Sequence, residues 1–354
     1  MDSIPFIRVK NISKSFSGKH ALKDVSFEIL KGELFVIVGY SGSGKSTLLR
    51  IIAGLERANS GEIYFGDTDV SKISPQNRKI GMVFQDYAVW PHMTVRKNIE
   101  FVLQNNGGNS KDKGNFIINL LKKVGLLDKI DSMPSQLSGG QLQRVALARA
   151  LAVKPDVLLM DEPLSNLDRQ VKKVLQLEIL RITKELNITT IFVTHDQEEA
   201  QLLADRIAVM NDGVIEQIGN QKDLYEKPAN VSVASFMNDV VLFDGVIKSC
   251  EGNHILADVE NKLIKLSPIN SINIEVGQKC KISVRVSDLQ LNDKGWINGV
   301  LISDKFYSGK NHLIISLSNN VTVNLEIEEF IKLDFGASVK LSPADEKVLL
   351  HLAR

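Results

Sequence analysis

The chain has 354 residues, of which 44% are apolar and 24% charged, a composition typical of a folded globular protein with a sizeable core. Its 43 basic and 42 acidic residues leave a formal net charge of +1, so no basic field favours nucleic acid as a partner. No apolar run approaches the ~18 residues of a membrane-spanning helix, and no signal peptide is expected. The length predicts two domains. The two cysteines, Cys250 and Cys280, are expected to be buried thiols.

The first part of the chain is predicted to form an antiparallel β subdomain. Residues 6–10 and 24–30 alternate apolar and polar side chains, which is the pattern of half-buried strands. Between them, Phe16 lies in a polar loop at residues 15–18. An aromatic ring at this position either stacks on a base or folds onto its own subdomain, and the residues leave both interpretations open.

Residues 34–49 combine a strand, a glycine-rich loop and the start of a helix. The apolar, partly β-branched residues 34–38 predict a strand buried on both faces of a parallel sheet. The loop after it reads GxxxxGKS, whose glycines let successive backbone N–H groups point at phosphates. Lys45 supplies a cation for the β- and γ-phosphates, and the Ser46 hydroxyl can ligate Mg²⁺. The predicted nucleotide-binding residues of this stretch are Gly39, Ser41, Gly42, Gly44, Lys45, Ser46 and Thr47.

Two more strands are predicted at residues 61–66 and 80–84. Gln85 follows the second of them, and in a nucleotide-binding sheet ligands gather at the carboxyl ends of the strands. A neutral amide at this place can help to hold Mg²⁺ or the attacking water without adding charge. A surface glutamine in a turn is the alternative that the local sequence leaves open.

Residues 87–155 are predicted to form a helical subdomain inserted into an α/β domain. Residues 94–104 and 116–124 have helical patterns, and the polar, glycine-rich residues 105–115 between them predict a loop. The loop that leads into the subdomain contains Trp90. This aromatic ring belongs either to the core of the subdomain or to a docking face for another protein.

A second anion site is predicted at residues 138–141, where Ser-Gly-Gly-Gln stands before a helix. Ser138 is well placed as the N-cap, and Gly139 and Gly140 leave the helix N-terminus open to an anion. Gln141 completes this predicted set. One nucleotide needs only one phosphate cradle, so the second site serves either another nucleotide or the far side of the same one.

Carboxylates and a histidine are predicted at the same sheet edge as the glycine-rich loop. The apolar residues 157–160 predict a strand that ends in Asp161 and Glu162. Asp161 can hold Mg²⁺, and Glu162 points to the other face of the strand, where it can deprotonate water. The strand at residues 189–193 then delivers His195, which can donate a hydrogen bond to a γ-phosphate.

The last third of the chain changes its pattern. Residues 206–217 predict a hairpin, and residues 221–226 and 230–237 predict two short helices. From residue 240 onward, short alternating runs are separated by Gly, Asn and Asp, which predicts a small all-β barrel or sandwich without a catalytic group.

Taken together, the motifs GYSGSGKST, LSGGQ, VLLMDEP and SNLD resemble the ATP-binding subunits of ABC transporters. The resemblance covers residues 1–238 and implies an ATPase that uses ATP and Mg²⁺. It implies a P-loop α/β domain with a parallel core sheet, an antiparallel β subdomain and the helical insertion. A small OB-like, all-β domain of the TOBE regulatory type is implied for residues 239–354.

The resemblance also implies a role for each site residue. Phe16 becomes the ring that stacks on adenine, Asp161 the Walker B carboxylate and Glu162 the general base. Gln85 links Mg²⁺ and water to the permease contact, and Asp168 lies in a loop that crosses a dimer interface.

Further roles concern the γ-phosphate, the partner chains and the permease. His195 becomes the switch histidine, and residues 138–141 contact the ATP held by a second copy of the chain. Residues 87–94 lie where family members contact the coupling helix of a permease.

The order of domains is similar to that of binding-protein-dependent importers. It implies a homodimer on the cytoplasmic face of the plasma membrane, joined to two permease subunits and indirectly to a solute-binding protein. The loop DYAVWPHMTV resembles the ferric-iron importers most, with polyamine and sugar importers close to them. Residues 285–288, Arg-Val-Ser-Asp, depart from the Arg-Pro-Glu pattern usual in this tail. A soluble ABC ATPase of repair or translation is a remote alternative, which lacks support because the chain has one cassette and no long coiled-coil insert.

Overall fold

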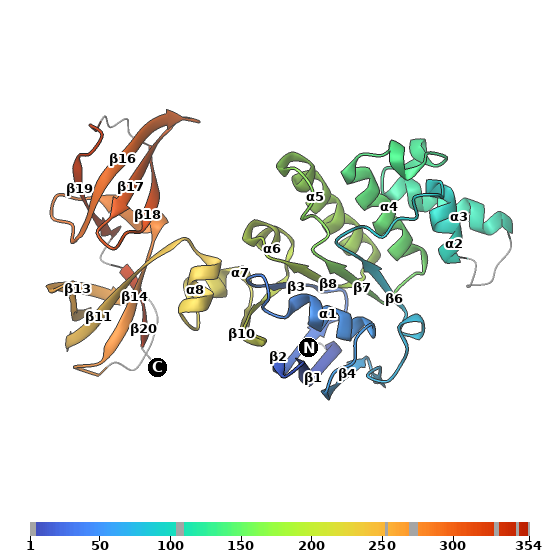
Figure 1. Ribbon diagram of the computed structural model, residues 1–354, viewed down its shortest axis with the longest axis horizontal. Coiled ribbons are helices and arrows are strands. Elements are labelled where there is room, and N and C mark those ends of the chain that lie inside the picture. The colour runs from blue at the N-terminus through green and yellow to red at the C-terminus, as the bar shows by residue number, and fades with distance from the viewer. Residues whose placement is uncertain are drawn as a thin grey trace. The chain divides into compact units, whose positions relative to one another are not determined.

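The computed structural model describes residues 5–103, 110–251, 254–268, 275–328, 333–344 and 347–352. The packing of the chain divides it into two compact units, Met1–Gln221 and Lys222–Arg354 (Figure 1). Among the described residues, no helix combines the length and the apolar character needed to cross a membrane.

The described part of the first unit contains a six-stranded core sheet in the order β10-β9-β3-β8-β7-β6. All neighbours in this sheet are parallel except β9 and β10, which form a hairpin. Every residue of β3, β7 and β8 is buried, as expected for uninterrupted apolar runs in a parallel sheet. The predicted core sheet is therefore confirmed. The strands are β3 (Leu34–Val38), β6 (Ile80–Val83), β7 (Val157–Asp161), β8 (Thr189–Thr194), β9 (Arg206–Asn211) and β10 (Val214–Gly219).

The N-terminal strands form the predicted antiparallel sheet, in the order β2-β1-β4-β5. They are β1 (Pro5–Phe16), β2 (Lys19–Leu30), β4 (Ser60–Phe65) and β5 (Thr68–Asp69). The β1–β2 hairpin is longer than predicted, so Phe16 ends β1 and pairs with Lys19 instead of lying in a loop. Only Ser17 and Gly18 turn the chain, both with positive φ, and such a short turn lets the ladder reach Phe16.

Helices flank the core sheet of the first unit. The helix α1 packs on alternate residues of β3, β7 and β8 through Leu48, Leu49 and Ile52. The same hydrophobic cluster includes residues of the N-terminal sheet. The α-helices are α1 (Lys45–Ala53), α2 (Val95–Leu103), α3 (Ser110–Lys123), α4 (Gly139–Ala152), α5 (Arg169–Leu186) and α6 (Gln197–Leu203). Short 3₁₀ helices span Pro75–Asn77, Leu127–Lys129 and Pro134–Gln136.

The helix α3 begins earlier than predicted. Residues 110–115 were predicted as part of a loop, but they form the first turns of α3, while residues 105–109 lie outside the described residues. Asp112 sits in the first turn, where a carboxylate is favoured by the positive end of the helix dipole. Burial of Ile117 and Leu121 anchors the helix, and its polar start continues from that anchored part.

The second unit is built from β-strands, as predicted. The strands form a closed barrel, β11-β12-β13-β20-β14, and a sheet in the order β15-β19-β16-β17-β18. The barrel strands are β11 (Val240–Glu251), β12 (His254–Val259), β13 (Lys262–Pro268), β14 (Lys279–Arg285) and β20 (Lys347–Leu352). The sheet contains β15 (Leu289–Leu291), β16 (Ile297–Tyr307), β17 (Lys310–Leu317), β18 (Thr322–Ile327) and β19 (Ser338–Pro343), and Val286–Asp288 is a 3₁₀ helix.

The two short helices α7 (Gln221–Glu226) and α8 (Val231–Met237) mark the boundary between the units. The sequence placed them in the first domain, with the boundary at residue 238, whereas the packing groups residues from Lys222 onward with the β-rich unit. The reason is that α8 packs against β14, and Arg285 donates a hydrogen bond to the Tyr225 carbonyl at 2.7 Å. The guanidinium of Arg285 also lies 4.3 Å from the centre of the Tyr225 ring.

The two cysteines lie in different environments. Cys280 is buried in the barrel, and burial raises the pKa of its thiol to about 11. Cys250 near the end of β11 is exposed, so the expectation of two buried thiols is wrong for it. Side chains alternate between the two faces of a strand, and Cys250 falls on the solvent face of β11.

Candidate nucleotide-binding and catalytic site

The glycine-rich loop joins the buried strand β3 to the N-terminus of α1. A Cβ atom on Gly39 would lie 2.0 Å from the Met210 carbonyl oxygen, so only glycine allows this approach. Lys45 is buried, and its Nζ donates to the carbonyl oxygens of Gly39 at 2.8 Å and Tyr40 at 2.9 Å. Burial lowers the pKa of the Lys45 ammonium, and the carboxylates of Glu162 and Asp161 oppose that shift. The loop thus holds a desolvated cation at a helix start, as a phosphate site requires.

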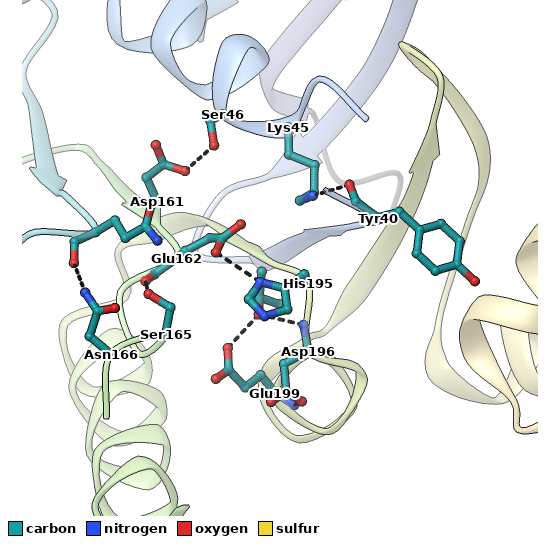
Figure 2. A network of polar contacts seen from close by, with 12 residues as sticks. Tyr40, Lys45, Ser46, Asp161, Glu162, Ser165, Asn166, His195, Asp196 and Glu199 are labelled. Atoms are coloured by element: carbon teal, nitrogen blue, oxygen red, sulfur yellow. Dashed lines mark hydrogen bonds and ion pairs between the residues drawn. The ribbon is translucent and has the colours of Figure 1, made fainter. Parts of the chain in front are cut away.

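Oxygen ligands suited to a divalent cation meet beside this loop. The Ser46 hydroxyl donates to Asp161 Oδ1 at 2.7 Å, which joins the first turn of α1 to the end of β7 (Figure 2). Burial raises the pKa of Asp161, whereas the hydrogen bond from Ser46 lowers it. A buried carboxylate and a hydroxyl are ligands that Mg²⁺ accepts, so this donor set fits the ion.

Glu162 and His195 meet at the carboxyl ends of the neighbouring strands β7 and β8. His195 Nδ1 lies 3.0 Å from Glu162 Oε2 (Figure 2). Glu162 has a φ of 44°, a left-handed conformation that is strained for a residue with a side chain. The Ser165 hydroxyl donates to the Glu162 carbonyl at 3.0 Å and helps to hold this conformation. The contact brings together two groups that the sequence predicted separately.

Gln85 lies at the end of β6, at the same edge of the core sheet. The main-chain carbonyl of Gln85 accepts a hydrogen bond from Asn166 Nδ2 at 3.2 Å, and Gln85 is exposed. The contacts of the described residues do not join its amide to Ser46 or Asp161. The structure therefore places Gln85 beside the loop that follows β7 and leaves its predicted role in holding Mg²⁺ as an expectation.

The start of α4 has the predicted capping pattern in a more complete form. Ser138 Oγ accepts from the Gln141 N–H at 3.4 Å, and Gln141 Oε1 accepts from the Ser138 N–H at 2.9 Å. These two bonds form a capping box, which explains why glutamine stands at this position. A Cβ atom on Gly140 would lie 2.8 Å from Val171 Cγ1, so this glycine also permits α4 and α5 to pack closely.

Asp168 caps the N-terminus of α5. Its Oδ1 accepts from the N–H groups of Gln170 at 3.1 Å and Val171 at 3.0 Å. Sequence reasoning did not assign this capping role, although an aspartate directly before a helical pattern is its usual signal.

The loop before α2 is held by two residues that sequence reasoning missed. Asn98 is fully buried, and it pairs with both the N–H and the carbonyl of Trp90, at 3.0 and 3.1 Å. The guanidinium of Arg149 lies 3.7 Å from the centre of the Trp90 ring and donates to the Ala88 carbonyl. Phe101, 46% exposed, lies 4.6 Å from Trp90 between ring centres. The available signal was the presence of polar residues at positions where the helical pattern predicts burial.

Phe16 is 46% exposed at the end of β1, so its ring is not part of the core of its sheet. Lys14 Nζ lies 4.7 Å from the centre of the ring, which is a cation–π distance. The exposed ring is available to a base, and the contact with Lys14 restricts its movement.

Replacing Phe16 by alanine is expected to weaken ATP binding by ~1–3 kcal/mol, because only base stacking is lost. Titration with a fluorescent ATP analogue measures this change. Phe101→Ala, which removes an equally exposed ring outside the site, is the matched control. Unchanged nucleotide affinity in the Phe16 variant would show that the ring has a structural role.

Comparison with known proteins places these observations in a family. Residues 22–165 match the family described as ABC transporter. The Fe(3+) ions import ATP-binding protein FbpC of Fusobacterium nucleatum subsp. nucleatum is 39% identical over 349 residues, 97% of this chain and 92% of that protein. The spermidine/putrescine import ATP-binding protein PotA of Photobacterium profundum is 37% identical over 344 residues, 96% of this chain and 88% of that protein.

A solved structure shares the fold. The dimeric post-hydrolysis structure of the ATP-binding cassette MJ0796, bound to ADP and Pi, has a TM-score of 0.54 and 31% sequence identity to this chain. The similarity covers 60% of this chain and 98% of that one.

The fold and the site together define a nucleotide-binding protein of the P-loop class. The chain belongs to the family of import ATP-binding proteins of ABC transporters. This confirms the resemblance drawn from the motifs, and it confirms that the chain is an ATP-binding ATPase subunit of this transporter family.

Proposed function

We propose that this chain hydrolyses ATP as a homodimer and drives the import of ferric iron through two permease subunits. The observation that carries the proposal is the Glu162 carboxylate, which is held by His195 next to the Lys45 loop. Similarity to the iron importer protein over 97% of the chain supports the solute. The subunit works on the cytoplasmic face of the plasma membrane. On the opposite face, a solute-binding protein delivers iron to the permease.

The residues of the glycine-rich loop bind the phosphates of ATP. In the described structure the Lys45 ammonium is satisfied by loop carbonyls, and it exchanges these for the β- and γ-phosphate oxygens when ATP arrives. Ser46 and Asp161, with Gln85 at the same sheet edge, would hold Mg²⁺, which would supply charge neutralisation at the phosphates.

Glu162 acts as the general base. Its carboxylate is 19% exposed, so it is open to a water molecule while His195 fixes one of its oxygens. His195 is 54% exposed and can turn its other ring nitrogen toward a γ-phosphate. The pair therefore offers one group for the attacking water and one for the transferred phosphate.

The partner chain completes each site. The capping box at Ser138 satisfies the N–H groups of Ser138 and Gln141, so Gly139 and Gly140 are the proposed donors to the γ-phosphate of the ATP held by the other copy. Asp168 lies in the loop that crosses between the copies. The dimeric assembly of the ATP-binding cassette MJ0796 supports this arrangement.

The loop at residues 87–94 is the proposed docking point for the permease. Trp90 with its partners Arg149 and Phe101 forms a partly exposed aromatic face there. The β-rich unit is the proposed TOBE-type regulatory domain. It begins near residue 239 according to the sequence prediction and at Lys222 according to packing.

A second candidate solute is a polyamine, because the spermidine/putrescine import protein PotA is 37% identical to this chain.

Deleting the gene for this chain is expected to reduce cellular uptake of radiolabelled ferric iron to background and to leave spermidine uptake unchanged. Complementation with the wild-type gene restores iron uptake, and the Glu162→Gln gene, as the control, does not. Loss of spermidine uptake with normal iron uptake would reassign the subunit to a polyamine importer.

A further inference from the structure

The backbone around His195 is held by four polar side chains. They are Lys172, Thr194, Asp196 and Glu199, and together they are called the His195 brace. In the view of Figure 2, Asp196 and Glu199 lie below His195, whereas the Glu162 carboxylate lies above it.

Three members of the His195 brace form a closed ring of hydrogen bonds around the turn. The Thr194 hydroxyl donates to Glu199 Oε2 at 2.7 Å and accepts from the Asp196 N–H at 3.0 Å. Asp196 Oδ1 in turn accepts from the Glu199 N–H at 3.2 Å and caps α6. Because Thr194 and Asp196 are the two neighbours of His195 in the chain, the ring fixes its backbone on both sides.

Lys172 ties this ring to a different element. Its Nζ lies 3.4 Å from Glu199 Oε1 and 3.7 Å from Asp196 Oδ2. Lys172 belongs to the first turns of α5, which is the helix that Asp168 caps. The His195 turn and the helix that follows the Asp168 loop are therefore joined by one ammonium group.

The charges of the His195 brace make it sensitive to the loss of the Lys172 ammonium. Glu199 is 2% exposed, and burial raises its pKa, while the Thr194 hydroxyl and the Lys172 ammonium lower it. A buried carboxylate is stable only while its hydrogen bonds and its cation remain in place. Removal of Lys172 thus leaves the buried Glu199 carboxylate without its cation directly behind the histidine turn.

We propose that the His195 brace positions the imidazole against Glu162 and transmits the position of the α5 N-terminus to it. Lys172 and Glu199 are positioning residues, since they act through the His195 turn and do not contact the reacting groups. The proposal rests on the ATPase function proposed above. It adds a physical link between the Asp168 loop, which faces the partner chain in that function, and the group that contacts the γ-phosphate.

The first test compares Glu199→Gln with Glu198→Gln in the full-length chain. Glu198 is the exposed neighbour of Glu199, so its variant is a matched control. We expect Glu199→Gln to lower kcat for ATP ~10- to 100-fold, as small displacements of a reacting group do, with little change in the Kd for ATP. Glu198→Gln is expected to keep the wild-type kcat. Equal kcat values for the two variants would overturn the proposal.

The second test separates positioning from a general structural role. In a His195→Ala background, adding Glu199→Gln is expected to cause no further loss of kcat, because the group that it positions is already gone. A loss of the same factor in both backgrounds would show that Glu199 only supports the fold. Thermal unfolding of all four chains establishes that they are folded.

The third test concerns the ion pair between Lys172 of α5 and Glu199, and it compares variants that remove one charge of the pair or both. Lys172→Met leaves the buried Glu199 carboxylate without its cation, and the double variant with Glu199→Gln removes that charge. We therefore expect the double variant to have a higher kcat than Lys172→Met alone, and the exposed neighbour variant Lys173→Met to match the wild type. A double variant no better than Lys172→Met contradicts the link.

A readout that needs no ATPase activity keeps the two proposals distinguishable. Among the six histidines of the chain, the NMR ring signal of His195 is the one that His195→Ala removes. This signal is expected to shift in Thr194→Val, which loses the hydroxyl, and to stay in place in Thr194→Ser, which keeps it. If the wild type hydrolysed no ATP, the proposed function would fail. The NMR signal would still test whether the His195 brace positions the imidazole. An unshifted signal in a folded Thr194→Val chain overturns the inference.

Discussion

Replacing Glu162 by glutamine is expected to abolish steady-state ATP hydrolysis and to leave ATP affinity near the wild-type value. The amide keeps the shape of the side chain and its contact with His195 Nδ1 at 3.0 Å, but it does not accept a proton from water. A general base contributes ~10²–10⁴ to the rate, so a loss of that size is expected in phosphate release. Glu198→Gln, an exposed carboxylate outside the site, is the matched control.

The same variant is expected to accumulate as an ATP-bound dimer. In the proposed function, hydrolysis ends the state in which two chains enclose ATP, so blocking it leaves that state populated. Size-exclusion chromatography with and without ATP measures the shift from monomer to dimer. Hydrolysis at close to the wild-type rate by Glu162→Gln would remove Glu162 from the role of base.

Mixing Lys45→Ala chains with Ser138→Arg chains is expected to restore ATP hydrolysis that neither variant shows alone. Lys45→Ala removes the buried ammonium of the phosphate loop, which damages the site in its own chain. Ser138→Arg breaks the capping box at the start of α4 and places a long side chain there, which damages the site of the partner. A heterodimer therefore has one doubly damaged site and one intact site.

The control places both changes on one chain and mixes it with the wild type. In those heterodimers each of the two sites carries one change, so they are expected to be inactive. Phosphate release by each mixture at equal total protein, after the activity of the homodimers that it contains is subtracted, compares the two kinds of heterodimer. Composite sites are falsified if a chain shown to be monomeric during turnover hydrolyses ATP at the full rate.

Local sequence patterns determined the core sheet and the chemistry at its edge. The apolar runs of β3 and β7 are buried on both faces, and only a parallel sheet covered by helices buries such runs completely. The glycine spacing before Lys45 and the adjacent acids Asp161 and Glu162 are also local, so the chain shows them without any knowledge of distant residues. For this reason the phosphate loop and the predicted carboxylates could be located from the sequence.

Tertiary packing decided the features whose partners are distant in the chain. The short helix α8 buries four apolar side chains, and its contact with β14 groups it with the β-rich unit. Phe16 ends a strand because the β1–β2 ladder continues to it, and ladder length depends on pairing between strands. The burial of Asn98 and its bonds to Trp90 likewise require α2 and the preceding loop to be folded together.

The site itself also combines features that local patterns predict with contacts that depend on packing. Two examples are the pairing of Glu162 with His195 and that of Lys172 with Glu199. The sequence pattern predicted that carboxylates and a histidine follow buried strands. The distance of 3.0 Å between Glu162 and His195 and that of 3.4 Å between Lys172 and Glu199 depend on how β7, β8, α5 and α6 pack. Ion pairs and hydrogen bonds act over a few ångströms, whereas a sequence pattern specifies only which face of an element a side chain occupies, so the tertiary structure alone decided these contacts.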